Sequence, residues 1–520
     1  MNWAPLRNKI FLGLWIGVLA SNVGTWMQTV GAQWLVVREP GAVTWVSLVQ
    51  AVTMLPVLLL ALPSGALADE LDRRRLLLGV QLSLLVVGAV LAALTWAGAM
   101  SPPLLLAFTF ALGTGQALTL PAWQAIIPEV VPRDELPAAS SLGAVNTNLA
   151  RSAGPAMAGL IVAQAGPAVV FALNALSFAI FAVALLRWRR PPAKTSTERF
   201  VPALRAGARY VEHSPEVRRI LLRVILFVLP GSVIWSLLPL VARAGLGLGA
   251  SGYGILLAAL GVGAIAGALL MPRVRRWTTP DVLIGAGGCA YTIALVLIAL
   301  IRQPVVAAGA LVIAGLAWMT LVSRMNAAMQ LFLPNWVRAR GFAVYQVVFA
   351  GGQAAGAVIW GQVAGPGGLR TTFLVAAAVM LAGTLTVRWL PLHTHEGSDR
   401  GPVSYWPEPH LMLQPHLDEG PVMVQAVWTV PAASGAAFVK AMDAVRRSRQ
   451  QTGATRWDLF RDGEQPDQYI EVYLVPTWAE HLAQHEDRLT GTDEHAEEEA
   501  AALATGRPEV THLLPADSSD

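Results

Sequence analysis

The chain has 520 residues, of which 55% are hydrophobic and only 13% are charged, about half the charged fraction of an ordinary soluble protein. A soluble protein of this length divides into several domains, each of which needs a charged surface. The composition therefore excludes a soluble enzyme, a nucleic-acid-binding protein or a secreted scaffold for the bulk of the chain.

The net charge of +4 combines two regions of opposite sign. Residues 1–400 contain 29 Lys or Arg and 13 Asp or Glu, whereas residues 401–520 contain 8 and 20. A basic body is thus followed by an acidic tail that has the composition of a soluble domain. The single cysteine, Cys289, lies in the body and excludes an intrachain disulfide.

Four long stretches, at 10–37, 40–68, 76–128 and 244–272, contain no charged residue at all. About 20 apolar residues are enough to cross a bilayer as a helix, so the body is an integral membrane protein. When the long apolar stretches are divided at Pro and Gly turn signals, we predict twelve spanning helices. They are expected at 10–37, 43–68, 76–98, 103–126, 138–164, 168–187, 218–242, 250–272, 281–301, 304–325, 338–364 and 370–390.

The loop charges predict the orientation of these helices. If the N-terminus is inside, the cytoplasmic segments carry 20 Lys or Arg and the outer loops carry 4. Positively charged loops stay in the cytoplasm, so both termini are expected there.

The body also repeats itself. Gly-Ala-Leu followed by paired arginines occurs at 65–74 and again at 267–276, and Gly-x4-Gly occurs at 154–159 and at 356–361. A parallel repeat of two six-helix halves is an arrangement of membrane transporters, with the substrate path between the halves. The expected parts are a first six-helix half at 1–187, a cytoplasmic linker at 188–217, a second six-helix half at 218–390, a linker at 391–420 and a soluble α+β domain at 421–515.

The loop after the second span carries Gly65, Asp69, Arg73 and Arg74. This pattern resembles the loop signature of the major facilitator superfamily, in which Gly-x-x-x-Asp runs into paired basic residues. The resemblance implies that these residues latch the two halves together on the inner side. Ordinary anchoring by positive charge would explain the arginines but not Asp69.

The fifth span contains Arg151, Gly154, Pro155 and Gly159, and it resembles the antiporter motif of drug exporters in this superfamily. We expect Pro155 to bend the helix and the small residues to permit close packing, which generic helix packing would also explain. A charge within a membrane span is a functional-site hypothesis by default. Three interpretations of Arg151 remain open. It could contact an anionic substrate, pair with another helix, or extend its charged group to the membrane–water interface.

The superfamily resemblance also implies which helices line the central cavity, namely the first, fourth, seventh and tenth. The polar and aromatic residues on these helices are the candidate substrate contacts: Asn22, Trp26, Gln116, Trp235 and Asn326.

The stretch 121–155 has a narrower likeness, to a bacterial branch of transmembrane secretion effectors that includes the enterobactin exporter. That resemblance implies a secondary active exporter of a drug, siderophore or secondary metabolite in the bacterial inner membrane. Its partners would be the bilayer and a small-molecule substrate, with no cofactor. Proton coupling is implied by the family only, because no Asp or Glu lies in the middle of a predicted span. The absence of a Gly-x4-Gly-Lys-Ser/Thr loop argues against a built-in ATPase.

In the tail, the alternation of apolar residues predicts strands and helices in the order β-α-β-β-α-β, as in ferredoxin-like folds. The tail resembles antibiotic-biosynthesis monooxygenase domains, which commonly dimerise through their sheets. We expect a regulatory or oligomerising domain whose negative charge favours docking on the basic cytoplasmic loops. Two alternatives remain open: an enzyme domain fused to the transporter, and a transporter-like membrane sensor.

His481 and His485 lie four residues apart, a spacing that places both on one face of a helix. Two histidines without a third ligand are weak evidence for a metal site. We therefore expect a solvated polar face and no metal, and we expect Trp428, Trp457 and Trp478 to serve core or dimer packing.

Overall fold

The structure is a computed structural model that describes residues 3–188, 200–274, 277–389, 403, 406, 411–413 and 415–516. It divides into two compact units, which we call the membrane unit and the C-terminal unit. The membrane unit comprises Met1–Thr197, Leu221–Asn326 and Tyr345–Leu392, and the C-terminal unit comprises Glu198–Ile220, Ala327–Val344 and His393–Asp520.

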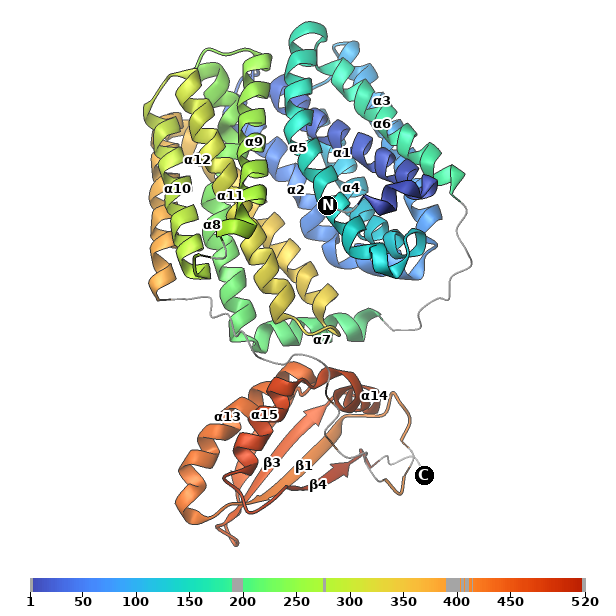
Figure 1. The fold of residues 1–520 in the computed structure, drawn as a ribbon, viewed down its shortest axis with the longest axis vertical. Coiled ribbons are helices and arrows are strands. Elements are labelled where there is room, and N and C mark those ends of the chain that lie inside the picture. The colour runs from blue at the N-terminus through green and yellow to red at the C-terminus, as the bar shows by residue number, and fades with distance from the viewer. Residues whose placement is uncertain are drawn as a thin grey trace. The chain divides into compact units, whose positions relative to one another are not determined.

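Long helices build the membrane unit, because a helix satisfies its backbone hydrogen bonds internally, which hydrocarbon surroundings require. The first half contains α1 (Lys9–Val36), α2 (Ala42–Glu70), α3 (Arg73–Trp96), α4 (Pro102–Val130), α5 (Leu136–Ala165) and α6 (Pro167–Arg187). The second half contains α8 (Pro215–Leu240), α9 (Ala250–Val274), α10 (Pro280–Leu300), α11 (Pro304–Phe332) and α12 (Arg338–Leu385), as Figure 1 shows.

Ten helical segments of the described chain are long and apolar enough to cross a membrane. Two features of the helices account for the difference between these ten segments and the twelve predicted spans. Helix α5 has 30 residues but carries polar side chains, among them Asn146 and Arg151. The 48-residue helix α12 is interrupted at Gly368, whose φ of 69° is not helical. A left-handed backbone is most readily adopted by glycine, so Gly368 turns the chain between two helical segments.

Glycines allow the helices to approach one another backbone to backbone. A Cβ added at Gly315 of α11 would overlap the carbonyl oxygen of Leu260 in α9, and one added at Gly263 of α9 would overlap that of Val312 in α11. Helices gain little from the hydrophobic effect inside a bilayer, so close packing of small residues is a main source of their association.

The C-terminal unit contains an antiparallel sheet of β1 (Val422–Thr429), β2 (Arg456–Arg461), β3 (Gln468–Val475) and β4 (Glu509–Leu513), in the order β2-β3-β1-β4. Helix α13 (Gly435–Thr452) connects β1 to β2. Between β3 and β4 lie α14 (Trp478–Ala483), a π-helical turn η6 (Gln484–Arg488) and α15 (Gly491–Ala501). Helices α13 and α15 lie side by side on the sheet (Figure 1).

Alternate residues of β1 and β3 are buried, as expected for a sheet with one covered face. Trp428 and Phe438 form part of one hydrophobic cluster and Trp478 forms part of another. The prediction that Trp428 and Trp478 serve core packing is confirmed.

A buried ion-pair network crosses this core. Arg449 of α13 donates through Nε to Glu471 Oε1 at 3.0 Å and also pairs with Glu497 of α15. Trp457 Nε1 donates to the same Glu471 oxygen at 2.9 Å, and Trp406 Nε1 donates to Glu497 at 2.8 Å. Because a buried charge is costly unless it is paired, this network fixes α13, α15 and β3 in one arrangement.

A segment that we expected only as a polar linker contains a helix. Helix α7 (Phe200–His213) lies between the two halves in sequence and belongs to the C-terminal unit. Its apolar residues fall on one side, which makes it strongly amphipathic.

The close approach of α9 and α11 gives a direct test. We expect Gly315→Ala to destabilise the protein by about 1–3 kcal/mol, because an overpacked contact forces backbone shifts. Thermal unfolding of the detergent-solubilised protein measures the loss. Gly309→Ala is the matched control, since a Cβ at Gly309 on the same helix meets nothing within 4 Å. Equal unfolding temperatures for the two variants would contradict the packing described above.

Candidate substrate site and conformational contacts

Trp26 of α1 is the centre of a group of side chains from three helices. The guanidinium of Arg151 in α5 lies 5.7 Å from the centre of the Trp26 ring. The Trp235 ring of α8 lies 5.8 Å from it, tilted by 43°. A Cβ at Gly154 would come within 2.7 Å of Trp26 Cβ, so only a glycine lets α5 bring Arg151 to this ring. Four predicted site residues, Trp26, Arg151, Gly154 and Trp235, thus meet at one place.

Two hydrogen-bond donors of this group have no acceptor in the described structure. Arg151 Nε and Trp235 Nε1 are both buried and form no hydrogen bond. An unsatisfied buried polar group is costly and in a native protein calls for an explanation. A ligand with acceptor atoms and a flat apolar surface would satisfy both donors and stack on the two rings.

Further aromatic side chains of the second half pack next to Trp235. Trp318 of α11 lies 5.8 Å from Trp235, and Phe227 and Phe349 pack around Trp318. The sequence analysis did not single out these residues, because aromatic residues in an apolar helix carry no signal of the face they occupy.

Asn22 and Gln116 are engaged in contacts between helices. Asn22 Nδ2 donates to Asn146 Oδ1 of α5 at 2.9 Å. Gln116 Nε2 of α4 donates to Thr25 Oγ1 of α1 at 2.9 Å. Both residues therefore hold α1 in place around Trp26. Within the described chain, the contacts around Trp26 do not include Asn326, whose buried Oδ1 accepts no hydrogen bond.

The basic pair after α2 contacts other helices of the first half. Arg73 donates to Glu129 Oε1 at 2.8 Å and to the carbonyl oxygen of Ala125 at 3.1 Å, both on α4. Arg74 donates to the last carbonyl groups of α6, including that of Leu185 at 2.9 Å. The helix dipole also favours a cation at this end of a helix. The side chain of Asp69 and the surroundings of Gly65 lie outside the described residues, so the predicted latch is described only in part.

Gln33, which the sequence analysis did not select, connects four helices. Its Nε2 donates to Gln50 Oε1 of α2 at 3.3 Å and to the carbonyl oxygen of Trp235 in α8 at 3.0 Å. The hydroxyl of Tyr253 in α9 donates to Gln33 Oε1. Since Gln33 is 1% exposed, this polar network is enclosed and links the first half to the second.

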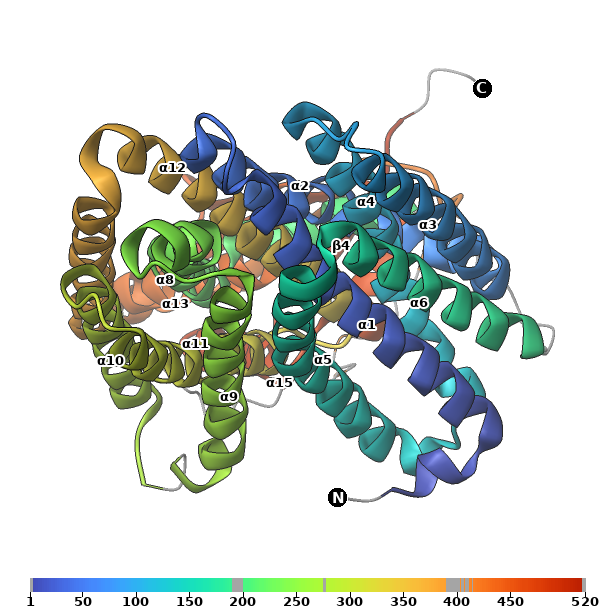
Figure 2. The same ribbon diagram turned by 90° about the horizontal axis from the view of Figure 1, so that it is seen from above.

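Further contacts between the halves occur at the same end of the membrane unit, which carries the α1–α2 and α8–α9 connections. A Cβ at Gly159 of α5 would lie 2.7 Å from Gly254 Cα of α9; Figure 2 shows the two helices side by side. Ser47 of α2 faces Gly361 of α12 in a similar close approach. This end is therefore closed, and Gly159 of the predicted antiporter motif is one of the residues that close it.

In the C-terminal unit, helix α7 packs against the acidic domain. Arg209 pairs with Glu480 of α14, and Gln451 Nε2 of α13 donates to the carbonyl oxygen of His213 at 3.0 Å. Arg488 of η6 pairs with Glu480 at 3.3 Å and lies 5.1 Å from the ring centre of Trp336. Trp336 precedes α12, so two segments next to membrane helices contact the domain.

The solvated face predicted for His481 and His485 is wrong. His481 is fully buried, at 0% exposure, and His485 is partly buried. The two rings pack against each other and against His512 of β4. Burial is the largest cause that lowers the pKa of His481 to about 3 and that of His485 to about 4. Both rings are therefore neutral at neutral pH.

Comparison with known proteins identifies the fold and the family of this chain. Over 75% of the chain, the structure resembles a bacterial homologue of the human lysosomal transporter Spinster in an inward-facing and unoccupied conformation, with a TM-score of 0.56 at 14% identity and 96% of that chain covered. The chain therefore shares the fold of that transporter. The family described as transmembrane secretion effector matches residues 1–520, and the chain belongs to this family.

Two curated relatives are similar in sequence. The staphyloferrin A transporter of Staphylococcus aureus is 26% identical over 258 residues, which are 49% of this chain and 65% of that protein. The multidrug efflux pump Tap of Mycolicibacterium fortuitum is 25% identical over 387 residues, which are 72% of this chain and 93% of the pump. The chain thus spans slightly less than two thirds of the first relative and nearly all of the second.

The contact of Gly159 with α9 predicts a shift between conformations. We expect Gly159→Ala to weaken the closed end by about 1–3 kcal/mol, since the added Cβ lies 2.8 Å from the Ala250 carbonyl oxygen. A Ser47→Cys reporter in a Cys289→Ser background should then react with a maleimide roughly tenfold faster. Gly143→Ala, on the same helix with nothing within 4 Å, should leave the rate unchanged. An unaltered rate in Gly159→Ala would overturn the assignment of this contact to closure.

The ion pair between α7 and α14 gives a second prediction. We expect Arg209→Glu to increase amide hydrogen exchange in α7 and α13, because two like charges would then face each other. The reversed pair, Arg209→Glu with Glu480→Arg, should recover part of the protection. Arg205→Glu, at an exposed position on the same helix, is the control. If all three variants exchange like the unmodified protein, the pair does not hold the domain to α7.

Proposed function

We propose that this protein is a secondary active exporter of small organic molecules that works by alternating access between two six-helix halves. Division of α12 at Gly368 and inclusion of α5 as a span support a count of twelve helices. Two relatives are named as a siderophore transporter and a multidrug efflux pump, which favours export. The orientation with both termini in the cytoplasm rests on the loop charges. In that orientation the closed end is the outer one, and this conformation faces inward.

The observation that carries the proposal is the group of Arg151, Trp26 and Trp235. A cation and two aromatic rings from both halves meet there, with two buried donors that lack acceptors. A site shared by two halves is the place where alternating access exposes a substrate first to one side and then to the other. The arrangement fits an organic molecule with a flat apolar part and an anionic or acceptor-bearing group.

The proposal also includes the energy source of transport and the role of the C-terminal domain. We infer that the proton gradient drives export, as the family resemblance implies. The C-terminal domain is proposed to regulate the transporter through α7, with Arg209 and Glu480 as the contact. Its edge strand β4 exposes Val510 and Leu513, which favours dimerisation through the sheet.

Transport assays with inside-out proteoliposomes test the function. With a panel of anionic, neutral and cationic fluorescent compounds, we expect uptake that stops when the proton gradient is collapsed. Arg151→Gln should reduce uptake of anionic compounds at least tenfold, because the buried site then lacks its charge, and Arg151→Lys should retain part of it. Arg302→Gln, which changes an exposed arginine, is the control.

Two outcomes would count against this function. A protein that moves none of the compounds in either direction would favour the membrane-sensor alternative. Uptake of anionic compounds by Arg151→Gln at the unmodified rate would remove Arg151 from the substrate site.

A further inference from the structure

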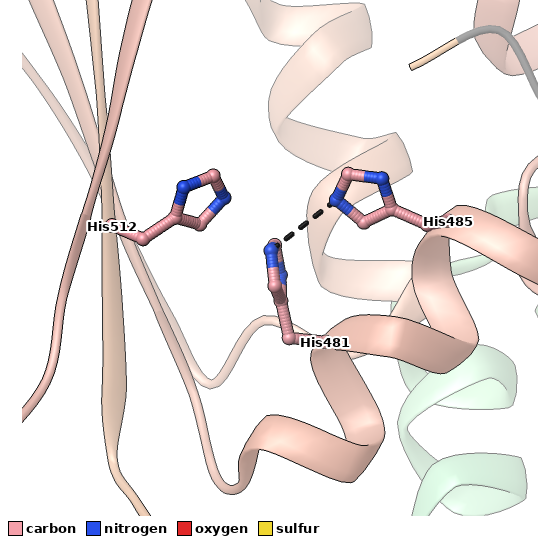
Figure 3. A group of neighbouring side chains, drawn as sticks. All are labelled: His481, His485 and His512. Carbon is pink, nitrogen blue, oxygen red and sulfur yellow. Dashed lines mark hydrogen bonds between the residues drawn. The ribbon is translucent and has the colours of Figure 1, made fainter. Parts of the chain in front are cut away.

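Three histidines from separate elements meet in the C-terminal domain. His481 lies on α14, His485 lies in η6, and His512 lies on β4. One ring nitrogen from each lies within 4.8 Å of the other two. Figure 3 shows the ring of His512 facing the pair formed by His481 and His485.

The fold explains how these residues come together. The spacing of four residues puts His481 and His485 on one face of the helical segment. Strand β4 pairs with β1, with His512 opposite Val424. This pairing places β4 beside β1, one of the two inner strands, and brings the third imidazole to the same place, 27 residues after His485.

The distances suit a metal ion with imidazole ligands. Zn–N bonds are about 2.0–2.1 Å, so two nitrogens of a tetrahedral site lie about 3.3–3.4 Å apart. His481 Nε2 and His485 Nε2 form a hydrogen bond at 3.2 Å. This distance already matches, and a metal ion would replace the proton between the two nitrogens. A rotation of the partly buried His512 side chain would bring its nitrogen to a comparable distance.

Hydrogen bonds around His481 fix which of its nitrogens has a free lone pair. Thr452 Oγ1 donates to the Ser448 carbonyl oxygen at 2.8 Å, so it accepts from Gln484 Nε2 at 3.1 Å. The Gln484 amide oxygen is thereby directed to His481 Nδ1, at 3.3 Å, and that nitrogen must donate. His481 Nε2 then has its lone pair directed at the cluster, and a partner on the other ring nitrogen is a regular feature of metal-binding histidines.

The surroundings of the three rings disfavour their protonation. Burial lowers the pKa of all three rings, and the Arg449 guanidinium lowers the pKa of His481 and His485 further. Among the described residues, none of the three rings forms an ion pair with a carboxylate, whereas the exposed His495 does. Beside His485, the ring of Trp406 donates to Glu497, part of a network with one guanidinium and two carboxylates.

Packing alone is the simpler explanation for buried histidines, but it leaves one observation without a reason. His485 Nδ1 is buried and forms no hydrogen bond in the described structure. A ring held only for its shape would be replaced by an apolar ring without this cost. The cost is better explained if the other nitrogen of this ring, Nε2, has a function. It lies 3.2 Å from His481 Nε2, where a ligand could bind to both nitrogen lone pairs.

We propose that His481, His485 and His512 form a binding site for one divalent transition-metal ion of the zinc class, with a fourth position left for water or an added ligand. Imidazole nitrogens suit Zn²⁺, Co²⁺, Ni²⁺ and Cu²⁺, whereas Mg²⁺ and Ca²⁺ take oxygen ligands. The site lies within the C-terminal domain and does not depend on the proposed transport function.

Metal titration of the full-length protein tests this site. The protein is purified in detergent with a tag that contains no histidine, in a Cys289→Ser background that removes the only thiol. We expect one Zn²⁺ per chain by elemental analysis, and visible absorption bands of nitrogen-bound Co²⁺ that Zn²⁺ abolishes. His512→Gln and His485→Gln should each weaken the binding at least tenfold.

The control variant is His495→Gln, which changes an exposed histidine on α15 and should bind metal like the unmodified protein. His512→Gln is the decisive variant, because His512 is partly exposed on an edge strand, and its fold is verified by hydrogen exchange of β1 and β3. Zn²⁺ should raise the unfolding temperature of the unmodified protein and not that of His512→Gln. The proposal is overturned if the unmodified protein binds no Zn²⁺ at micromolar concentration. It is equally overturned if His512→Gln, correctly folded, binds as tightly.

Discussion

The close approach of helix backbones at glycine positions is the contact on which the membrane unit depends. At Gly154 it lets α5 come near enough to α1 for Arg151 to lie over Trp26. At Gly159 it closes one end of the unit against α9, and at Gly315 it fixes α11 against α9. Lipid provides no hydrophobic force between helices, so these contacts supply packing that larger side chains would prevent. The same contacts locate the candidate substrate site, because that site exists only where α1, α5 and α8 converge.

Much of the membrane unit could be predicted from the sequence, because a bilayer imposes a simple rule on composition. Uncharged stretches correspond to helices, and Arg73 and Arg74 lie at the start of α3. Trp26, Trp235 and Arg151 could be selected as rare polar or aromatic residues on helices of interest. Asn326 was selected by the same reasoning, yet in the described chain it is not among the contacts of Trp26. A linear pattern identifies the helix and not the face.

The parts that could not be predicted depend on contacts between distant segments. Gln33 is one of several amides in an apolar run, and only the fold shows that it links α1 to α8 and α9. The sequence analysis missed helix α7 because the charge of the linker suggested a solvated chain. The apolar residues of α7 nevertheless have helical spacing. The histidine cluster was underestimated for a related reason. The spacing of His481 and His485 is visible in the sequence, whereas His512 joins them through strand pairing.

One consequence arises from the order of residues on α14. Glu480, which pairs with Arg209 of α7, and His481, which faces the two other histidines, are consecutive residues on one short helix. A rotation of that turn therefore changes both contacts at once. Metal binding by the histidines and formation of the Arg209–Glu480 ion pair are then thermodynamically linked. Each must change the equilibrium constant of the other by the same factor. The domain would in this way combine the availability of a metal ion and the position of α7 into a single equilibrium.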